Sequence, residues 1–251
     1  MTTGDALLLD IEAQMQDIGL PLMARKLDQI YRSPDYLTRD KLSLISDILA
    51  PEYQDKTSKR LNNRMKTAKL IGTPCDISKC TDSSTRQYTP AGSPQILSSL
   101  KFIEDGLNVC ILGASDSGKT YLAKAIRAAA CEKYRVSYNR CDEFLSGLVT
   151  LKQRDYAKYE RRIRKILNFH LLIIDDFLLN TVTDEREIKV LLEVLEKRIE
   201  LSRSTVVCSQ REPDKWKAMI MNDAVSADAI LKRGTKHYIV MIQLKNCIRV
   251  I

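Results

Sequence analysis

Apolar residues in the first part of the chain recur every three or four positions. This spacing covers residues 7–18, 23–30 and 42–49, and it is typical of amphipathic helices, so three short helices are predicted. The segment 56–69 keeps the same period and carries six positive charges, which predicts a further helix with one strongly basic face. We therefore expect a small helical N-terminal domain over residues 1–71.

A different pattern begins near residue 100, where short β-rich runs alternate with helical periods. The predicted strands are residues 109–112, 136–138, 171–174, 205–208 and 238–242. The predicted helices are residues 119–133, 142–151, 156–167, 184–201, 213–221 and 225–232. This alternation indicates an α/β domain over residues 100–251, built on a parallel sheet with crossover helices.

The segment between these two regions is rich in Thr, Ser, Pro and Gly. Pro74, Pro90, Gly92 and Pro94 interrupt it, and such residues favour turns over helices and strands. We therefore predict a linker over residues 72–99 with little regular structure, and we place the domain boundary there.

The composition is that of a globular protein with an excess of positive charge. With 44% hydrophobic and 29% charged residues the chain can bury a core, which excludes the disordered and collagen-like classes. Lys and Arg number 40 against 32 Asp and Glu, and the net charge of +8 makes nucleic acid the first partner to test. The 7 cysteines lack regular spacing, so we expect reduced thiols. No apolar stretch is long enough to span a membrane and no signal-peptide pattern is present, so we expect a cytoplasmic protein.

Residues 113–120 match the phosphate-loop pattern, in which two glycines separated by four residues precede Lys and Thr. A predicted strand precedes this segment and a predicted helix follows it, as the pattern requires. Glycines let the backbone N–H groups point inward, and the new helix directs its positive end at the same point. The pattern therefore favours a loop that binds a triphosphate such as ATP over an ordinary turn that contains glycines.

The predicted nucleotide-binding residues are the whole loop: Gly113, Ala114, Ser115, Asp116, Ser117, Gly118, Lys119 and Thr120. Within it, Lys119 would neutralise the β and γ phosphates, and the Thr120 hydroxyl would hold Mg²⁺. ATP and Mg²⁺ are therefore the predicted ligands.

Two acids follow the apolar strand 171–174. A phosphate-loop enzyme needs one acid near its metal and another that polarises the attacking water. We assign Asp175 to Mg²⁺ and Asp176 to the water. A structural acid or a helix cap is the alternative for each, and the strand and helix alternation around them favours the functional interpretation.

Two polar residues later in the chain are further candidates for the reaction. Gln210 follows the strand 205–208 and could report hydrolysis of the γ phosphate. Arg233 follows a predicted helix and could act as an arginine finger on the nucleotide of a neighbouring subunit. A strand-end amide and a solvated surface arginine are the respective alternatives.

Two basic runs favour binding to the phosphates of DNA, and the first is the segment 56–69 described above. Such binding would be independent of base sequence and sensitive to salt. The second run lies within residues 152–165 and has Tyr156 and Tyr159 interleaved. The predicted DNA-binding residues are Lys59, Arg60, Arg64, Lys66, Lys69, Arg154, Arg161 and Arg162. Solvated charged faces are the alternative. No helix-turn-helix or zinc-finger pattern indicates base-specific recognition.

Four segments together resemble the IstB-like transposition-helper ATPases, which are relatives of the DnaC-type helicase loaders within the AAA+ class. They are residues 113–120, 172–177, 205–210 and 227–233, and Trp216 lies between the last two. The resemblance implies a helical module ahead of an AAA+ core whose five-stranded parallel sheet has the order 5-1-4-3-2. It also assigns Gln210 the sensor role and Arg233 the finger role. The chain departs from the family in having Gly234 where a leucine is usual, and from the wider AAA+ class in having Asp176 instead of glutamate.

The resemblance further implies a function. Family members assemble on DNA in an ATP-dependent way and regulate a cognate transposase by presenting target DNA to it. We therefore expect an ATPase that converts ATP and water to ADP and phosphate, is stimulated by DNA, and forms homo-oligomers on duplex DNA. The alternatives are a DnaC-type loader of a replicative helicase, and a nucleotide-gated DNA-binding scaffold without turnover.

Overall fold

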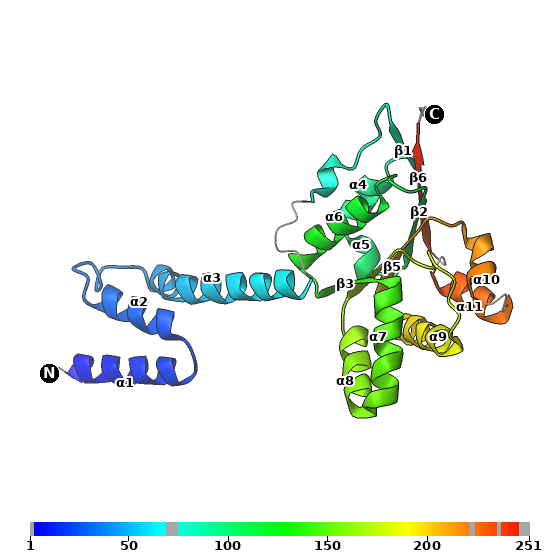
Figure 1. The fold of residues 1–251 in the computed structure, drawn as a ribbon. Helices are drawn as coiled ribbons and strands as arrows, with labels where there is room; N and C mark the ends of the chain where they lie inside the picture. The colour runs from blue at the N-terminus through cyan, green and yellow to red at the C-terminus, as the bar shows by residue number, and fades with distance from the viewer. Residues whose placement is uncertain (1–2, 69–74, 221–223, 235–236, 246–251) are drawn as a thin grey trace. The chain divides into compact units, whose positions relative to one another are not determined.

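The computed structural model describes residues 3–68, 75–220, 224–234 and 237–245. The chain divides into two compact units, Met1–Asn63 and Arg64–Ile251. Figure 1 labels most of their helices and strands. Among the described residues, no helix has the length and apolar character needed to cross a membrane.

The first unit is helical, as predicted, but its helices are fewer and longer. It contains α1 (Thr3–Asp17), α2 (Pro21–Tyr31) and most of α3 (Lys41–Thr67). The expectation of separate helices at 42–49 and 56–69 is wrong, because α3 runs through both segments with Pro51 inside it. A proline removes one backbone hydrogen bond from a helix, and here the helix continues past that loss.

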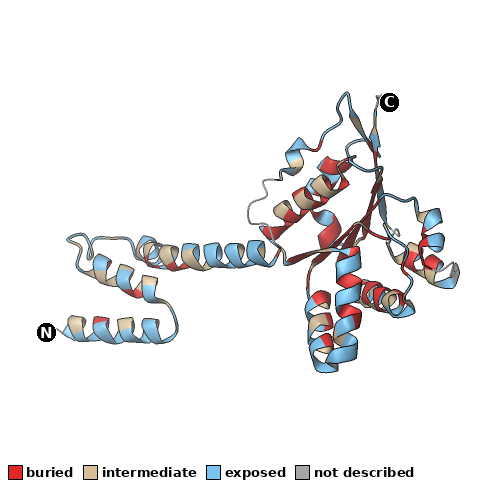
Figure 2. Ribbon diagram, viewed as in Figure 1, coloured by how far each residue is buried: buried red, intermediate tan, exposed pale blue. Residues whose placement is uncertain are grey.

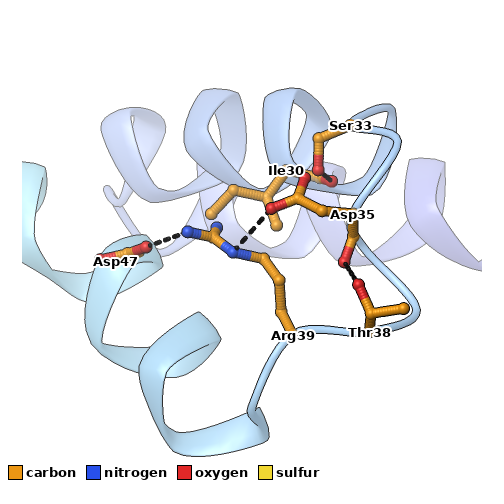
Figure 3. A network of polar contacts seen from close by, with 6 residues as sticks. All are labelled: Ile30, Ser33, Asp35, Thr38, Arg39 and Asp47. Carbon is orange, nitrogen blue, oxygen red and sulfur yellow. Dashed lines mark hydrogen bonds and ion pairs between the residues drawn. The ribbon is translucent and has the colours of Figure 1, made fainter.

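Polar contacts fix the loop that joins α2 to α3 (Figure 3). Arg39 reaches across the loop, with Nε 3.3 Å from Asp35 Oδ2 and Nη2 3.0 Å from Asp47 Oδ2. The Ser33 hydroxyl donates to the Ile30 carbonyl at 2.6 Å, and the Thr38 hydroxyl donates to the Asp35 carbonyl at 2.9 Å. These short-range bonds order a loop that leaves apolar surface exposed, since Leu37 is 91% exposed.

The second unit is an α/β domain whose described residues form one six-stranded sheet. The strands are β1 (Arg86–Thr89), β2 (Val109–Gly113), β3 (Val136–Arg140), β4 (Leu171–Asp175), β5 (Ser204–Ser209) and β6 (Tyr238–Leu244). Their order is β1-β6-β2-β5-β4-β3. The strands from β2 to β6 are parallel and follow the predicted order 5-1-4-3-2 when they are numbered from one. The prediction of a five-stranded, all-parallel sheet is corrected by β1, which pairs antiparallel with β6.

Helices cover both faces of this sheet (Figure 1). One face carries α4 (Ser93–Ser98), α5 (Lys101–Glu104) and α6 (Lys119–Cys131), and the other carries α7 (Cys141–Arg154), α8 (Tyr156–Leu167), α9 (Glu185–Glu200), α10 (Trp216–Met219) and α11 (Ala224–Gly234). Side chains alternate along each strand, so in β2 Ile111 joins the α6 side of the core while Cys110 and Leu112 join the other. Parallel strands buried on both faces read as continuous apolar runs, and for that reason the sequence revealed them.

The predicted linker contains regular structure. A short 3₁₀ helix, η1 (Ile77–Lys79), precedes β1, and α4 follows it. The expectation of little regular structure over residues 72–99 is therefore wrong for residues 75–99, while 72–74 lie outside the described residues. Tyr88 and Leu97 are buried in the same core as α6, so this segment belongs to the second unit.

Candidate functional site

The phosphate-loop segment joins β2 to α6, as predicted. Gly118 precedes the first residue of α6 with φ of 102°, a conformation that residues with a Cβ rarely adopt. Gly113 is required for a different reason: a Cβ there would lie 2.5 Å from the carbonyl oxygen of Ile242 and 2.6 Å from Ser117 Oγ. The two glycines therefore let the loop turn tightly between the sheet and the helix.

Lys119 points back into this loop. Its Nζ donates to the Ala114 carbonyl at 2.6 Å, and the residue is 6% exposed. Burial lowers the pKa of Lys119, while the nearby carboxylates of Asp175 and Asp176 act in the opposite direction. The ammonium group is thus held inside the loop by the Ala114 carbonyl, within electrostatic reach of the two acids at the end of β4.

The loop offers donors suited to a polyphosphate. Ser117 Oγ is buried and has no hydrogen-bond partner among the described residues, which leaves its hydroxyl available within the loop. The first backbone N–H groups of α6 lack partners within the helix and direct positive charge at the same point. Thr120, half-buried in the first turn, adds an oxygen of the kind that Mg²⁺ prefers. These residues fit a nucleoside triphosphate with its metal.

Asp175 and Asp176 are held in different ways at the end of β4. Asp175 is 2% exposed, and its carboxylate accepts hydrogen bonds from the Tyr138 hydroxyl and from the backbone N–H of Asp176. Burial, followed by the bond to Asp175, raises the pKa of Tyr138, so this hydroxyl remains a donor. Asp176 has a positive φ of 52°, and its Oδ2 lies 2.9 Å from Nη2 of Arg140.

Tyr138 and Arg140 were missed by sequence reasoning. Both lie in β3, the strand beside β4, and Arg140 is in register with Asp175. The carboxyl ends of parallel strands meet at one edge of a sheet, which is where ligands bind in such folds. That rule could have drawn attention to the last residues of β3, but their pairing with particular acids depends on the register.

Gln210 lies at the same edge, as predicted from its place after β5. It is exposed and lines a cavity of about 580 Å³ together with Leu112, Gly113 and Ala114. The preceding residue, Ser209, is buried and donates its hydroxyl to the Phe177 carbonyl at 2.9 Å, which ties the end of β5 to the turn after β4. The structure therefore brings Gln210 to the start of the phosphate loop.

Arg233 is engaged within its own chain. Its Nη2 lies 2.7 Å from Glu196 Oε1, its Nη1 donates to the Ala229 carbonyl at 3.2 Å, and the side chain is 28% exposed. These contacts do not join it to the phosphate loop. A role on a neighbouring subunit would require the ion pair with Glu196 to open.

The predicted DNA-binding residues of α3 differ in their surroundings. Arg60 and Lys66 are exposed, whereas Lys59 forms an ion pair with Asp55 at 2.7 Å. Arg64 is half-buried and donates to the Lys133 carbonyl at 3.0 Å. Lys69 lies outside the described residues.

The second basic run follows α7 and α8. Arg154 and Arg161 are exposed, while Arg162 lines a cavity of about 270 Å³ with Arg140 and Glu143. Tyr159 is 1% exposed and donates its hydroxyl to Glu193 at 3.0 Å. Only Tyr156, of the two interleaved tyrosines, is therefore accessible for stacking on a base.

A family comparison matches nearly the whole chain. Residues 13–250 match the family model described as IstB-like ATP binding protein. The chain belongs to this family. A Sinorhizobium fredii relative, named as an insertion sequence ATP-binding protein, is 28% identical over 223 residues, which are 88% of this chain and 87% of the relative. An insertion sequence ATP-binding protein of Bacillus thuringiensis is 31% identical over 140 residues, which are 55% of this chain and 54% of the relative, so that match spans about half of each.

Solved structures share the fold of about two thirds of this IstB-like protein. The crystal structure of the DnaC helicase loader matches with a TM-score of 0.52 and 16% identity, over 67% of this chain and 96% of that one. The replication initiator DnaA bound to AMPPCP and single-stranded DNA matches with a TM-score of 0.54 and 20% identity, over 68% of this chain and 51% of that one. The predicted family and AAA+ fold class are thus confirmed.

Proposed function

We propose that this IstB-like protein binds ATP with Mg²⁺ and hydrolyses the ATP to ADP and phosphate. The observation that carries the proposal is that the phosphate loop, Asp175, Asp176 and Gln210 follow neighbouring strands and gather at one edge of the sheet. Lys119 would leave the Ala114 carbonyl to bind phosphate oxygens. Thr120 and Asp175 would hold Mg²⁺, which when bound neutralises charge that develops on the phosphates.

Asp176 would orient the attacking water, and its present contact sets a condition for that role. Because its carboxylate is paired with Arg140, this ion pair must open or shift before Asp176 can accept a hydrogen bond from water. Gln210, beside the loop, would sense the γ phosphate. Arg233 would act as a finger on a neighbouring subunit after leaving Glu196.

Two variants test the ATPase assignment. Lys119→Ala should abolish ATP binding in calorimetry, because it removes the positive charge that faces the phosphates. Asp176→Asn should bind ATP normally yet release phosphate at a rate lower by about 100-fold or more, as for loss of a positioned acid or base. Lys101→Ala, which removes an exposed lysine from α5, is the control with unchanged binding and rate. Normal ATP binding by Lys119→Ala would rule out the assignment of the loop.

We further propose that the protein forms homo-oligomers on duplex DNA and regulates a cognate transposase in DNA transposition by presenting target DNA, in the cytoplasm. Three observations support this: the net charge of +8, relatives named as insertion sequence proteins, and the fold shared with a DnaA structure bound to single-stranded DNA. Of the predicted DNA contacts, Arg154 and Arg161 of the second basic run and Arg60 and Lys66 of the first are exposed.

Charge reversal tests the DNA contact. Replacing Arg154 and Arg161 together with glutamate should weaken binding to duplex DNA and flatten its dependence on salt, because fewer counterions are released. The same reversal at Arg60 and Lys66 tests the exposed part of the first basic run. If neither pair alters affinity, both runs are solvated surfaces.

The alternatives make different predictions. A DnaC-type loader, which the shared fold favours, should capture a replicative helicase from native cells, whereas a transposition helper should capture a transposase. A nucleotide-gated scaffold should bind ATP and DNA but release no phosphate. Steady-state phosphate release with and without duplex DNA separates the scaffold from both ATPases, and a higher rate with DNA is the result expected here.

A further inference from the structure

Arg86, which lies outside the recognised motifs, contacts the phosphate loop. It belongs to β1, the strand that was not predicted from the sequence. In the sheet, Tyr88 of β1 pairs with Ile242 of β6, and Ile242 pairs on its other side with Gly113. Arg86 pairs with Leu244, two positions further along β6. The register therefore places Arg86 beyond the carboxyl end of β2, where the loop begins.

The alternation of side chains along β1 sets the face on which Arg86 lies. Tyr88 is buried in the core on the α6 side of the sheet, and Arg86, two residues earlier, lies on the same side. Gln87, between them, is exposed. Arg86 is thus at the correct edge and on the correct face to meet the start of α6.

The contact itself is close. A Cβ on Gly118 would lie 2.9 Å from Cζ of Arg86 and 3.1 Å from its Nη2, so the guanidinium lies directly against this glycine. The Nε of Arg86 is buried and has no hydrogen-bond partner among the described residues. The ion pairs found within the described part of the chain do not include Arg86 either. The Tyr88 hydroxyl interacts with the same guanidinium, so only Nε lacks a partner within the described part of the chain. Leaving a buried donor unpaired is costly, which indicates that Nε serves an acceptor other than the described residues.

We propose that Arg86 binds the α or β phosphate of the nucleotide, an inference that rests on the proposed function of the loop. Its guanidinium presents several N–H donors in a planar fork that matches two phosphate oxygens. Gly118 belongs to the part of a phosphate loop whose N–H groups cradle the α and β phosphates, whereas the lysine reaches the β and γ phosphates. Arg86 therefore acts on ATP and ADP alike, unlike the γ-phosphate roles proposed for Gln210 and Arg233.

Affinities for ATP and ADP test this proposal, measured by calorimetry in EDTA so that neither metal nor turnover contributes. Arg86→Met keeps most of the side-chain volume and removes the charge, and it should weaken both ligands by a similar factor of about 10 to 100. Arg86→Lys keeps a point charge without the fork and should weaken both by a smaller factor. Gln87→Ala, on the other face of the same strand, should bind like the wild-type chain.

The outcomes separate this inference from the function on which it rests. If the wild-type chain binds neither nucleotide, the proposed function of the loop fails. If the wild-type chain binds both and Arg86→Met binds them equally well, Arg86 only packs against Gly118 and the inference fails alone. A loss confined to ATP would also overturn it, because the contact would then be to the γ phosphate. Should Arg86→Met melt at a much lower temperature than wild type, Arg86→Lys decides, and unchanged ADP affinity in that variant contradicts the proposal.

Discussion

The two units of the chain bury their apolar residues to different extents (Figure 2). In the first unit several large apolar side chains face solvent, among them Leu37 at 91% and Leu42 at 77% exposure. In the second unit the strands β2, β4 and β5 are buried almost throughout, and apolar layers cover both faces of the sheet. The helical spacing of apolar residues alone therefore did not distinguish a helix whose apolar stripe is buried from one whose stripe faces solvent.

This contrast extends to polar groups. In the first unit the buried Glu52 of α3 accepts hydrogen bonds from the Leu22 and Met23 N–H groups at the start of α2. In the second unit Arg198 of α9 is fully buried and ties together the ends of several elements. Stability in a small unit with few apolar contacts depends on individual polar bonds, whereas in a layered core such bonds add to extensive burial. Three substitutions can sharpen or break this comparison.

Replacement of Arg198 by alanine should have the largest effect. Its guanidinium donates to the carbonyls of Ile166, Phe169 and Ser204 and to the hydroxyl of Thr205. Without it these buried acceptors lose their partner and a cavity forms, at a cost of about 3–5 kcal/mol. Urea unfolding followed by Trp216 fluorescence measures this, because Trp216 is buried in the second unit. Arg161→Ala, on the exposed face of α8, is the matched control, and an equal loss there would contradict the role of Arg198.

Replacement of Glu52 by alanine should have an intermediate effect, confined to the first unit. The carboxylate satisfies two N–H groups at the start of α2, where negative charge also complements the helix dipole. Its loss should cost about 1–2 kcal/mol. Hydrogen exchange should show faster exchange in α2 and unchanged exchange in β4. Glu52→Gln retains an acceptor and should cost less. Faster exchange in β4 as well as in α2 would show that the two units unfold together, which would weaken the comparison.

The parts of the fold that could be predicted are those encoded locally. The strands β2, β4, β5 and β6 of the parallel core carry continuous apolar runs. The carboxyl ends of β2, β4 and β5 place the phosphate loop, Asp175 and Gln210 at one edge. The strand β1 is only four residues, of which Tyr88 alone is apolar, and it lies in a segment rich in turn formers. It forms because β6, about 150 residues later, offers an edge for pairing, and no local pattern encodes that partner.

The same distinction applies to the candidate site. The loop and the acids belong to motifs whose spacing reflects their chemistry, so the sequence identified them. Tyr138, Arg140 and Arg86 join the site through strand register and pairing, which sequence spacing does not contain. Arg64 was predicted to lie on a basic face, but its contact with the Lys133 carbonyl joins residues distant in the chain. The sequence shows which residues are basic, but the tertiary structure decides which of them remain exposed and accessible to DNA.

Replacement of Leu42 by alanine should have the smallest effect and tests the comparison directly. Leu42 lies on the apolar stripe that predicted a helix, yet it is 77% exposed, so little apolar surface returns to water when it is removed. We expect a change in unfolding free energy of less than about 0.5 kcal/mol. Leu191→Ala, the same substitution at a position that is 1% exposed in α9, should cost about 2–5 kcal/mol because it removes buried surface and leaves a cavity. If Leu42→Ala cost as much as Leu191→Ala, the stripe of the first unit would be buried in solution, and the difference between the units would lie in an assembly that covers it.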